Sequence, residues 1–205
     1  MTPPIADTVG QWPVVSSAER YRGKIIKVRS DTIRSPDGNT AEREAVEHPG
    51  AVAVLSLDES CRVLMIRQYR HPVGRLLWEL PAGLRDVAGE PLLQTARREL
   101  LEETGYRAAR WDVLVDYFTS PGIITERLRV FLARGLELAP EADRDFVPEN
   151  EEAHLLVDWV PLEEAVSLVL AGDLHNGVAV VGILAARAAS ADGFGSLRAA
   201  DAPEK

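Results

Sequence analysis

The chain has 205 residues, of which 46% are hydrophobic and 27% charged, so it can bury a sizeable core and is not intrinsically disordered. Its formal net charge of −9 argues against binding nucleic acid or an anionic membrane through the bulk surface. A single cysteine, Cys61, excludes an internal disulfide, and no apolar run is long enough to span a membrane. The N-terminus also lacks a basic segment followed by an apolar one, so we expect a cytoplasmic protein.

The sequence pattern of residues 1–48 predicts a proline-containing arm followed by a small antiparallel sheet. Alternating segments indicate strands at 21–29, 31–34 and 40–47, and Ser35-Pro36-Asp37-Gly38 is a strong turn signal between the last two. A sheet of this size has little core of its own. We therefore expect residues 1–48 to pack against the main domain or against a partner subunit.

We expect residues 49–190 to form the main domain. Residues 191–205 are mostly small and polar, which predicts a flexible tail. Apolar runs indicate strands at 51–57, 62–69, 76–80, 111–118, 128–136 and 154–160. One helix is expected from Pro161 to near Gly172, and another from Asn176 or Gly177 to about Ser190. With a further helix after the third of these strands, this order predicts an α/β (α+β) fold.

That further helix lies in residues 83–106, which read GLRDVAGEPLLQTARRELLEETGY. An apolar stripe for packing is formed by Leu92, Leu93, Ala96 and Leu100. The carboxylates of Glu99, Glu102 and Glu103 project together from another side of the helix, where like charges repel. The common alternative is a solvated Glu/Arg-rich surface. A divalent cation that gathers the three acids explains the pattern better, because Gly83 and Gly105 bracket the segment.

The segment resembles the Nudix box, whose pattern is G-x5-E-x7-R-E-U-x-E-E-x-G-U, with U an aliphatic residue. The residues that match it in order are Glu90, Arg98, Glu99, Leu100, Glu102, Glu103 and Gly105. It departs in two places, since six residues separate Gly83 from Glu90 and Tyr106 replaces the last aliphatic residue. The resemblance implies the Nudix fold, an α/β/α sandwich with a mixed sheet, and hydrolysis of a nucleoside diphosphate linked to another group.

The family also implies roles for residues of this segment. The metal, Mg²⁺ or alternatively Mn²⁺, would be held by Glu99, Glu103 and the carbonyl of Ala82, with Glu102 as a further ligand or orienting group. Arg98 and Glu90 would form the ion pair that supports these ligands. In this scheme the metal lowers the pKa of a water, which then attacks one phosphorus of the pyrophosphate.

The group that accepts the proton of this water must lie elsewhere, and the family often places it on a later loop. Here the run Pro148-Glu149-Asn150-Glu151-Glu152 precedes a predicted strand. Glu149, Glu151 and Glu152 are the candidate bases, and Glu151 is also a candidate metal ligand. The alternative is an acidic loop that is only solvated, and the sequence does not choose among the three glutamates.

Similarity to the ADP-ribose pyrophosphatase branch of the family suggests where the substrate binds. Pro121 lies sixteen residues after Gly105, which is the position of a proline typical of that branch. Pro121 and Gly122 are therefore candidate substrate contacts. The alternative is that Ser120-Pro121-Gly122 is only an ordinary turn between strands. Arg70 and Arg43 are candidate phosphate contacts, and the alternative for both is a surface ion pair.

The branch implies hydrolysis of ADP-ribose to AMP and ribose 5-phosphate by a homodimer whose N-terminal sheets pack across subunits. One alternative is the same chemistry on another nucleoside diphosphate derivative, such as a sugar nucleotide or a dinucleotide. A less favoured alternative is a Nudix-fold ligand sensor without catalysis. Sensors of that kind usually carry a DNA-binding module or a damaged box, and the sequence shows neither.

Overall fold

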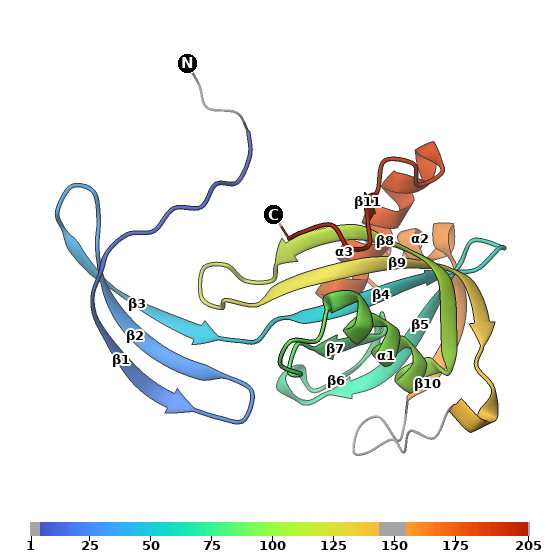
Figure 1. Cartoon of the computed structure of the whole chain (residues 1–205), viewed down its shortest axis with the longest axis horizontal. Coiled ribbons are helices and arrows are strands. Elements are labelled where there is room, and N and C mark those ends of the chain that lie inside the picture. The colour runs from blue at the N-terminus through green and yellow to red at the C-terminus, as the bar shows by residue number, and fades with distance from the viewer. Residues whose placement is uncertain (1–4, 144–154, 205) are drawn as a thin grey trace. The chain divides into compact units, whose positions relative to one another are not determined.

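The computed structural model describes residues 5–143 and 155–204, which form two units (Figure 1). The N-terminal unit contains the chain up to Pro49 together with Ser120–Glu126. The main unit contains Gly50–Thr119 and the chain from Arg127 onward. Because Ser120–Glu126 returns to the N-terminal unit, that unit is built from two stretches that are distant in the sequence.

The N-terminal unit contains a three-stranded antiparallel sheet in the order β1–β2–β3. Its strands are β1 (Val14–Arg22), β2 (Lys27–Arg34) and β3 (Thr40–Glu47). The small sheet and its turn are confirmed, since the Gly38 N–H donates to the Ser35 carbonyl at 2.9 Å. The predicted strand at 21–29 is wrong. The Gly23 N–H donates to the Ile26 carbonyl at 2.9 Å, and the turn that they close separates β1 from β2.

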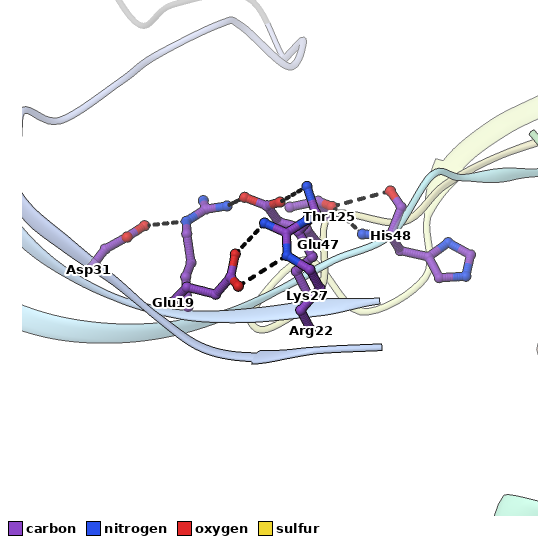
Figure 2. Close-up of polar contacts among 8 residues, drawn as sticks. Glu19, Arg22, Lys27, Asp31, Glu47, His48 and Thr125 are labelled. Atoms are coloured by element: carbon purple, nitrogen blue, oxygen red, sulfur yellow. Dashed lines mark hydrogen bonds and ion pairs between the residues drawn. The ribbon is translucent and has the colours of Figure 1, made fainter. Parts of the chain in front are cut away.

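Polar side-chain contacts within and between strands add to the backbone pairing of this sheet (Figure 2). Arg29 of β2 donates to Asp31 at 2.7 Å and pairs with Glu47 of β3. Lys27 Nζ also lies 3.7 Å from Glu47 Oε2. Ser17 Oγ of β1 donates a hydrogen bond to Asp31 Oδ1 of β2 at 2.6 Å. The hydrogen bonds from Ser17 and Arg29 hold the pKa of Asp31 below its ordinary value. Since β1 is exposed along its whole length, its pairing relies on backbone and polar contacts.

The loop Ser120–Glu126 attaches to the end of β3. The Val46 N–H donates to the Ile123 carbonyl at 2.8 Å, and the Thr125 N–H donates to the Val46 carbonyl at 2.9 Å. Thr125 Oγ1 accepts a hydrogen bond from the His48 N–H at 3.0 Å, although the two residues are 77 positions apart (Figure 2). The loop therefore extends the N-terminal sheet from a distant part of the chain.

The main unit is built on a mixed sheet. Its strands are β4 (Ala51–Leu57), β5 (Arg62–Arg70), β6 (Arg75–Glu79), β7 (Ala82–Leu84), β8 (Tyr106–Phe118), β9 (Arg127–Leu138), β10 (Leu156–Pro161) and β11 (Arg198–Ala199). The order is β10–β5–β4–β9–β8–β11, while β6 pairs with β5 and β7 with β4. Only β4 and β9 run parallel among these named pairs, so the sheet is mixed as predicted. Short 3₁₀ helices occupy His71–Val73, Glu141–Asp143 and Ser190–Asp192.

Side-chain alternation divides the core between the two faces of this sheet. On β4, Val52 and Val54 belong to the cluster that contains α1 (Leu92–Thr104). Ala53 and Leu55 belong to the cluster that contains α2 (Leu162–Ala171) and α3 (Gly177–Ala189). Helices therefore cover both faces (Figure 1), which confirms the predicted sandwich. No helix in the described ranges is long and apolar enough to cross a membrane.

The end of the chain differs from the flexible tail predicted for residues 191–205. Arg198–Ala199 forms β11, which pairs with β8 in an antiparallel register. Arg198 Nη1 lies 2.9 Å from Asp116 Oδ2, and Arg129 contacts the same carboxylate. These partners are far apart in the sequence, so composition alone gave no sign of them.

Gly50 offers a test of how tightly β4 and β9 approach each other. It has φ +87°, and a Cβ there would lie 2.8 Å from the Arg127 carbonyl oxygen. We expect Gly50→Ala to lower the free energy of unfolding by about 3 kcal/mol, because overpacking adds to the strain of the left-handed conformation. Gly172→Ala is the matched control, since Gly172 has φ +79° and open space around it. Chemical denaturation should show a clearly larger loss for Gly50→Ala, and equal losses would contradict the close approach.

Candidate active site

The sequence of α1 determines which of its sides carries the acids. Ala96 and Leu100 are fully buried against the sheet, and Leu92 and Leu93 pack beside them, so the predicted apolar stripe is confirmed. The helix ends at Gly105, which has φ 74° and donates its N–H to the Leu101 carbonyl at 2.8 Å. With the stripe fixed on the sheet, the glutamates are held on a different side.

Two of these glutamates converge on β7, which the sequence analysis did not predict as a strand. A Cβ on Gly83 would lie 2.0 Å from both Cδ and Oε1 of Glu99, so the Glu99 carboxylate rests directly on the glycine. Oε2 of Glu103 accepts a hydrogen bond from the Ala82 N–H at 2.9 Å. A side chain at position 83 would therefore displace the Glu99 carboxylate from its present place.

Arg98 ties the acids of the helix to the preceding loop. Its Nη1 lies 2.7 Å from Glu99 Oε1 and 3.1 Å from Glu102 Oε2. Its Nη2 lies 3.3 Å from Glu90 Oε2, so the expected Glu90–Arg98 ion pair is present. Thr95 Oγ1 donates to the same Glu90 oxygen at 2.9 Å. Thr95 was not predicted as a site residue, although its position one helical turn before Arg98 is a usable signal in the sequence.

These contacts shift the ionisation of the pair. Hydrogen bonds from Arg98 and then Thr95 lower the pKa of Glu90 from its ordinary value. Partial burial works against the charged form of Arg98. The hydrogen bond to Glu90 and the charges of Glu99 and Glu102 outweigh burial and raise the pKa of Arg98. Both groups therefore stay charged at neutral pH.

The candidate metal ligands are the carboxylates of Glu99, Glu102 and Glu103 and the carbonyl of Ala82. Their oxygen atoms suit a hard divalent cation. Within residues 5–143 and 155–204, however, no three acidic, histidine or cysteine side chains are arranged to hold a metal. Arg98 contacts Glu99 and Glu102, while the Ala82 N–H engages Glu103. A cation at this position would have to draw Glu99 and Glu102 away from Arg98.

Arg70, a predicted phosphate contact, forms a two-pronged ion pair. Its Nε and Nη2 donate to Glu79 Oε1 at 2.9 Å and Oε2 at 2.6 Å. Glu79 is only 2% exposed, whereas the side chain of Arg70 is 44% exposed. The alternative of an ion pair is therefore realised, and it compensates a buried charge. Glu79 was not assigned a role from the sequence, because only burial distinguishes it from a surface acid.

The remaining predicted substrate contacts lie in the N-terminal unit, and the acids of α1 lie in the main unit. Arg43 and Gly122 line one pocket of about 390 Å³ together with Ser30, Glu42, Glu44 and Ile123. Arg43 Nη1 donates to the Glu42 carbonyl at 2.7 Å. Pro121 belongs to the loop that supplies Gly122. The structure thus brings Arg43 and Gly122 together from distant parts of the chain.

The candidate bases Glu149, Glu151 and Glu152 lie outside the described residues. Their roles, and that of Glu151 as a metal ligand, stay predictions from the sequence.

Two models of known protein families match this chain, one over most of the main unit and one over most of the N-terminal strands. The family model described as NUDIX domain matches residues 47–179, and the model described as nucleoside diphosphate sugar hydrolase N-terminal domain matches residues 12–46. The chain is 46% identical to ADP-ribose pyrophosphatase of Mycobacterium tuberculosis, over 91% of this chain and 88% of that protein. It is 36% identical to ADP-ribose pyrophosphatase of Bacillus subtilis, over 79% and 85%.

A solved structure has the same fold. A crystal structure described as an ADP compounds hydrolase superposes with a TM-score of 0.74 and covers 92% of this chain and 99% of that chain. The two sequences share 20% identity, so this likeness bears on the fold alone.

The hydroxyl of Thr95 can be tested through the ionisation of Glu90. We expect Thr95→Val to raise the pKa of Glu90 toward its ordinary value of 4.5, because one donor to the carboxylate is lost. A carboxylate with a lowered pKa stabilises the fold above its unfolded pKa, and this stabilisation disappears as pH falls through the folded value. The variant should therefore differ most from the wild type near neutral pH and less in acid.

An NMR titration of the glutamate carboxyl carbons, with unfolding measured across the same pH range, provides the measurement. Thr40→Val removes a hydroxyl from β3 in the other unit and serves as the control. An unchanged Glu90 titration in Thr95→Val would show that the hydroxyl does not contribute.

Proposed function

The chain belongs to the Nudix hydrolase family, and we propose that it is a magnesium-dependent ADP-ribose pyrophosphatase. The reaction would convert ADP-ribose and water into AMP and ribose 5-phosphate. The observation that supports this substrate most is the similarity to the mycobacterial ADP-ribose pyrophosphatase, which extends over nearly the whole of both chains. The reaction class rests in addition on the set of acids around Gly83.

Glu99, Glu102, Glu103 and the carbonyl of Ala82 would hold Mg²⁺, or alternatively Mn²⁺. Their placement supports this, since Glu99 rests on Gly83 and Glu103 is hydrogen-bonded to the neighbouring Ala82. Once bound, the metal would neutralise pyrophosphate charge and lower the pKa of an attacking water.

The residues around the acids would keep the site assembled while the metal is loaded. Glu99 and Glu102 must leave the guanidinium of Arg98 in order to face a cation. Glu90 stays with Arg98 because it contacts Nη2, whereas Glu99 and Glu102 contact Nη1, and because it also accepts a hydrogen bond from Thr95. Arg98 thus retains a partner throughout, which avoids leaving a partly buried charge uncompensated.

In the proposed hydrolysis, the water oxygen forms a bond to one phosphorus and the bond from that phosphorus to the bridging oxygen breaks. The bridging oxygen leaves with the other phosphate, so the two products each carry one phosphate group. One of Glu149, Glu151 and Glu152 would accept the proton of the water, as the family resemblance implies.

Arg70 would contact a phosphate of the substrate in addition to Glu79, because a large part of its side chain is exposed. Arg43, Pro121 and Gly122 would contact the nucleotide from the N-terminal unit. The shared pocket of Arg43 and Gly122 supports this grouping.

We also infer that the enzyme is a homodimer assembled through its N-terminal unit. Its exposed large apolar residues include Trp12, Val14, Val15, Tyr21 and Ile25, which are about half exposed. A sheet that leaves so much apolar surface uncovered lacks an adequate core of its own. A second copy of the chain would cover this surface.

A sugar nucleotide is the second candidate substrate, because the N-terminal unit matches the model described for nucleoside diphosphate sugar hydrolases. Purified protein should be assayed with Mg²⁺ against ADP-ribose, sugar nucleotides and dinucleotides. We expect kcat/KM for ADP-ribose to exceed the others by at least about tenfold, which corresponds to ~1.4 kcal/mol of transition-state binding. A sugar nucleotide that ranks above ADP-ribose by that margin would replace our choice.

Glu103→Gln tests the assignment of the metal ligands. A glutamine carbonyl can still accept the Ala82 N–H, so the fold should remain while the charge is lost. We expect kcat to fall by about a thousandfold or more, since loss of a ligand carboxylate removes several kcal/mol of stabilisation. Glu164→Gln, in the first turn of α2, is the control and should keep full activity. Near-normal turnover by Glu103→Gln would refute the ligand role.

A further inference from the structure

We propose that the C-terminal segment Arg198–Glu204 positions the loop that leads into α1, with Glu204 as its key positioning residue. The effect on catalysis rests on the function proposed above, whereas the effect on the loop does not. We call Arg198–Glu204 the C-terminal strap.

A partly buried ion network anchors the strap to the main sheet. Arg129 of β9, which is 3% exposed, donates to Asp116 of β8 at 2.7 and 2.9 Å. Arg198 Nη1 donates to the same carboxylate at 2.9 Å. Burial alone would raise the pKa of Asp116, but its hydrogen bonds to Arg129 and Arg198 outweigh burial and lower it. The two arginines are thus paired with an ionised acid, as a charged network away from water requires.

The same arginine also holds the backbone of the strap. Arg129 Nη1 donates to the Ala202 carbonyl at 2.7 Å, and the Ala202 N–H donates to the Ala199 carbonyl at 2.9 Å. Ala200 and Ala202 pack against the cluster that contains α1. The strap therefore lies on the same face of the sheet as the acids of α1.

Glu204 connects the strap to the loop. Its Oε1 lies 3.3 Å from Nη1 of Arg85 and 3.4 Å from Nε of Arg127. All three side chains are at least two-thirds buried, so this carboxylate shared by two guanidinium groups is less screened than a surface pair. Arg85 is the second residue after Gly83, and Arg127 is the first of β9. Glu204 thus bridges the loop to the sheet.

Arg85 is held from its other side as well. Its N–H donates to the Gly50 carbonyl at 3.1 Å, and its Cδ would lie 3.1 Å from a Cβ at Gly50. The strap also meets the far end of the loop, because Glu90 and Pro91 line one cavity of about 440 Å³ with Ala202 and Glu204. Both ends of the loop are therefore next to the strap.

The residues at the two ends of the loop, Gly83 and Glu90, contact or support the acids of α1. Gly83 supports the Glu99 carboxylate, and Glu90 holds Arg98, which contacts Glu99 and Glu102. A change in the position of the loop would move both supports at once. The strap would therefore set the geometry of the acids without contacting them, which is how supporting residues act on a metal site.

Glu204→Ala tests this role. We expect hydrogen exchange of the backbone amides in residues 84–90 to accelerate about fivefold, the change expected from losing one partly buried ion pair. Binding of Mn²⁺, measured by the electron paramagnetic resonance signal of the free ion, should weaken by a similar factor. With ADP-ribose, kcat should fall more than KM rises. Glu204→Gln, which keeps an acceptor for the two arginines, should recover part of each effect.

Glu163→Ala is the control for losing an ion pair elsewhere in the main unit, because it removes a 2.7 Å ion pair with Arg187 that joins α2 and α3. It should leave exchange in residues 84–90 and Mn²⁺ binding unchanged. If Glu204→Ala lowers thermal stability but leaves both measurements unchanged, the strap is only a structural element and the proposal is wrong. If the wild type fails to hydrolyse ADP-ribose, the proposed function is wrong, while exchange and Mn²⁺ binding still decide the role of the strap.

Discussion

Repulsion among three carboxylates on one side of a short helix is the constraint around which the main unit is arranged. Arg98 offsets it for Glu99 and Glu102, and the Ala82 N–H offsets it for Glu103. Every element nearby contributes to this balance: β7 supplies the backbone donor, the loop supplies Glu90, and the apolar stripe of α1 fixes the direction of the acids. The loss of any one support would leave like charges facing each other at partial burial.

In this arrangement the guanidinium of Arg98 supplies the positive charge that the acids need. Without a metal, Arg98 compensates the acids, and with one, the acids would turn to the metal while Glu90 keeps Arg98 paired. In the proposed enzyme, loading a metal would exchange one positive partner for another. The helix therefore has its acids compensated by groups that belong to the fold itself, Arg98 and the Ala82 N–H.

The features that could be predicted from the sequence are those set by spacing within a single element. The side of α1 that carries Glu99, Glu102 and Glu103 follows from helix periodicity, and the cap at Gly105 follows from glycine conformation. The features that could not be predicted depend on contacts between distant segments. Gly83 beneath Glu99, the buried pairing of Glu79 and the anchoring of residues 198–204 leave no local pattern, because burial arises only when the chain has folded.

The N-terminal unit draws on two stretches of the chain, and this has a consequence for folding. Strands β1, β2 and β3 are made before the loop that bonds to Val46 and His48, which follows about 75 residues later and leads directly into β9. Until that loop has been made, the small exposed sheet lacks part of its hydrogen bonding and is marginal by itself. Contacts between such distant segments slow folding, so the small sheet is completed later than its own strands are made.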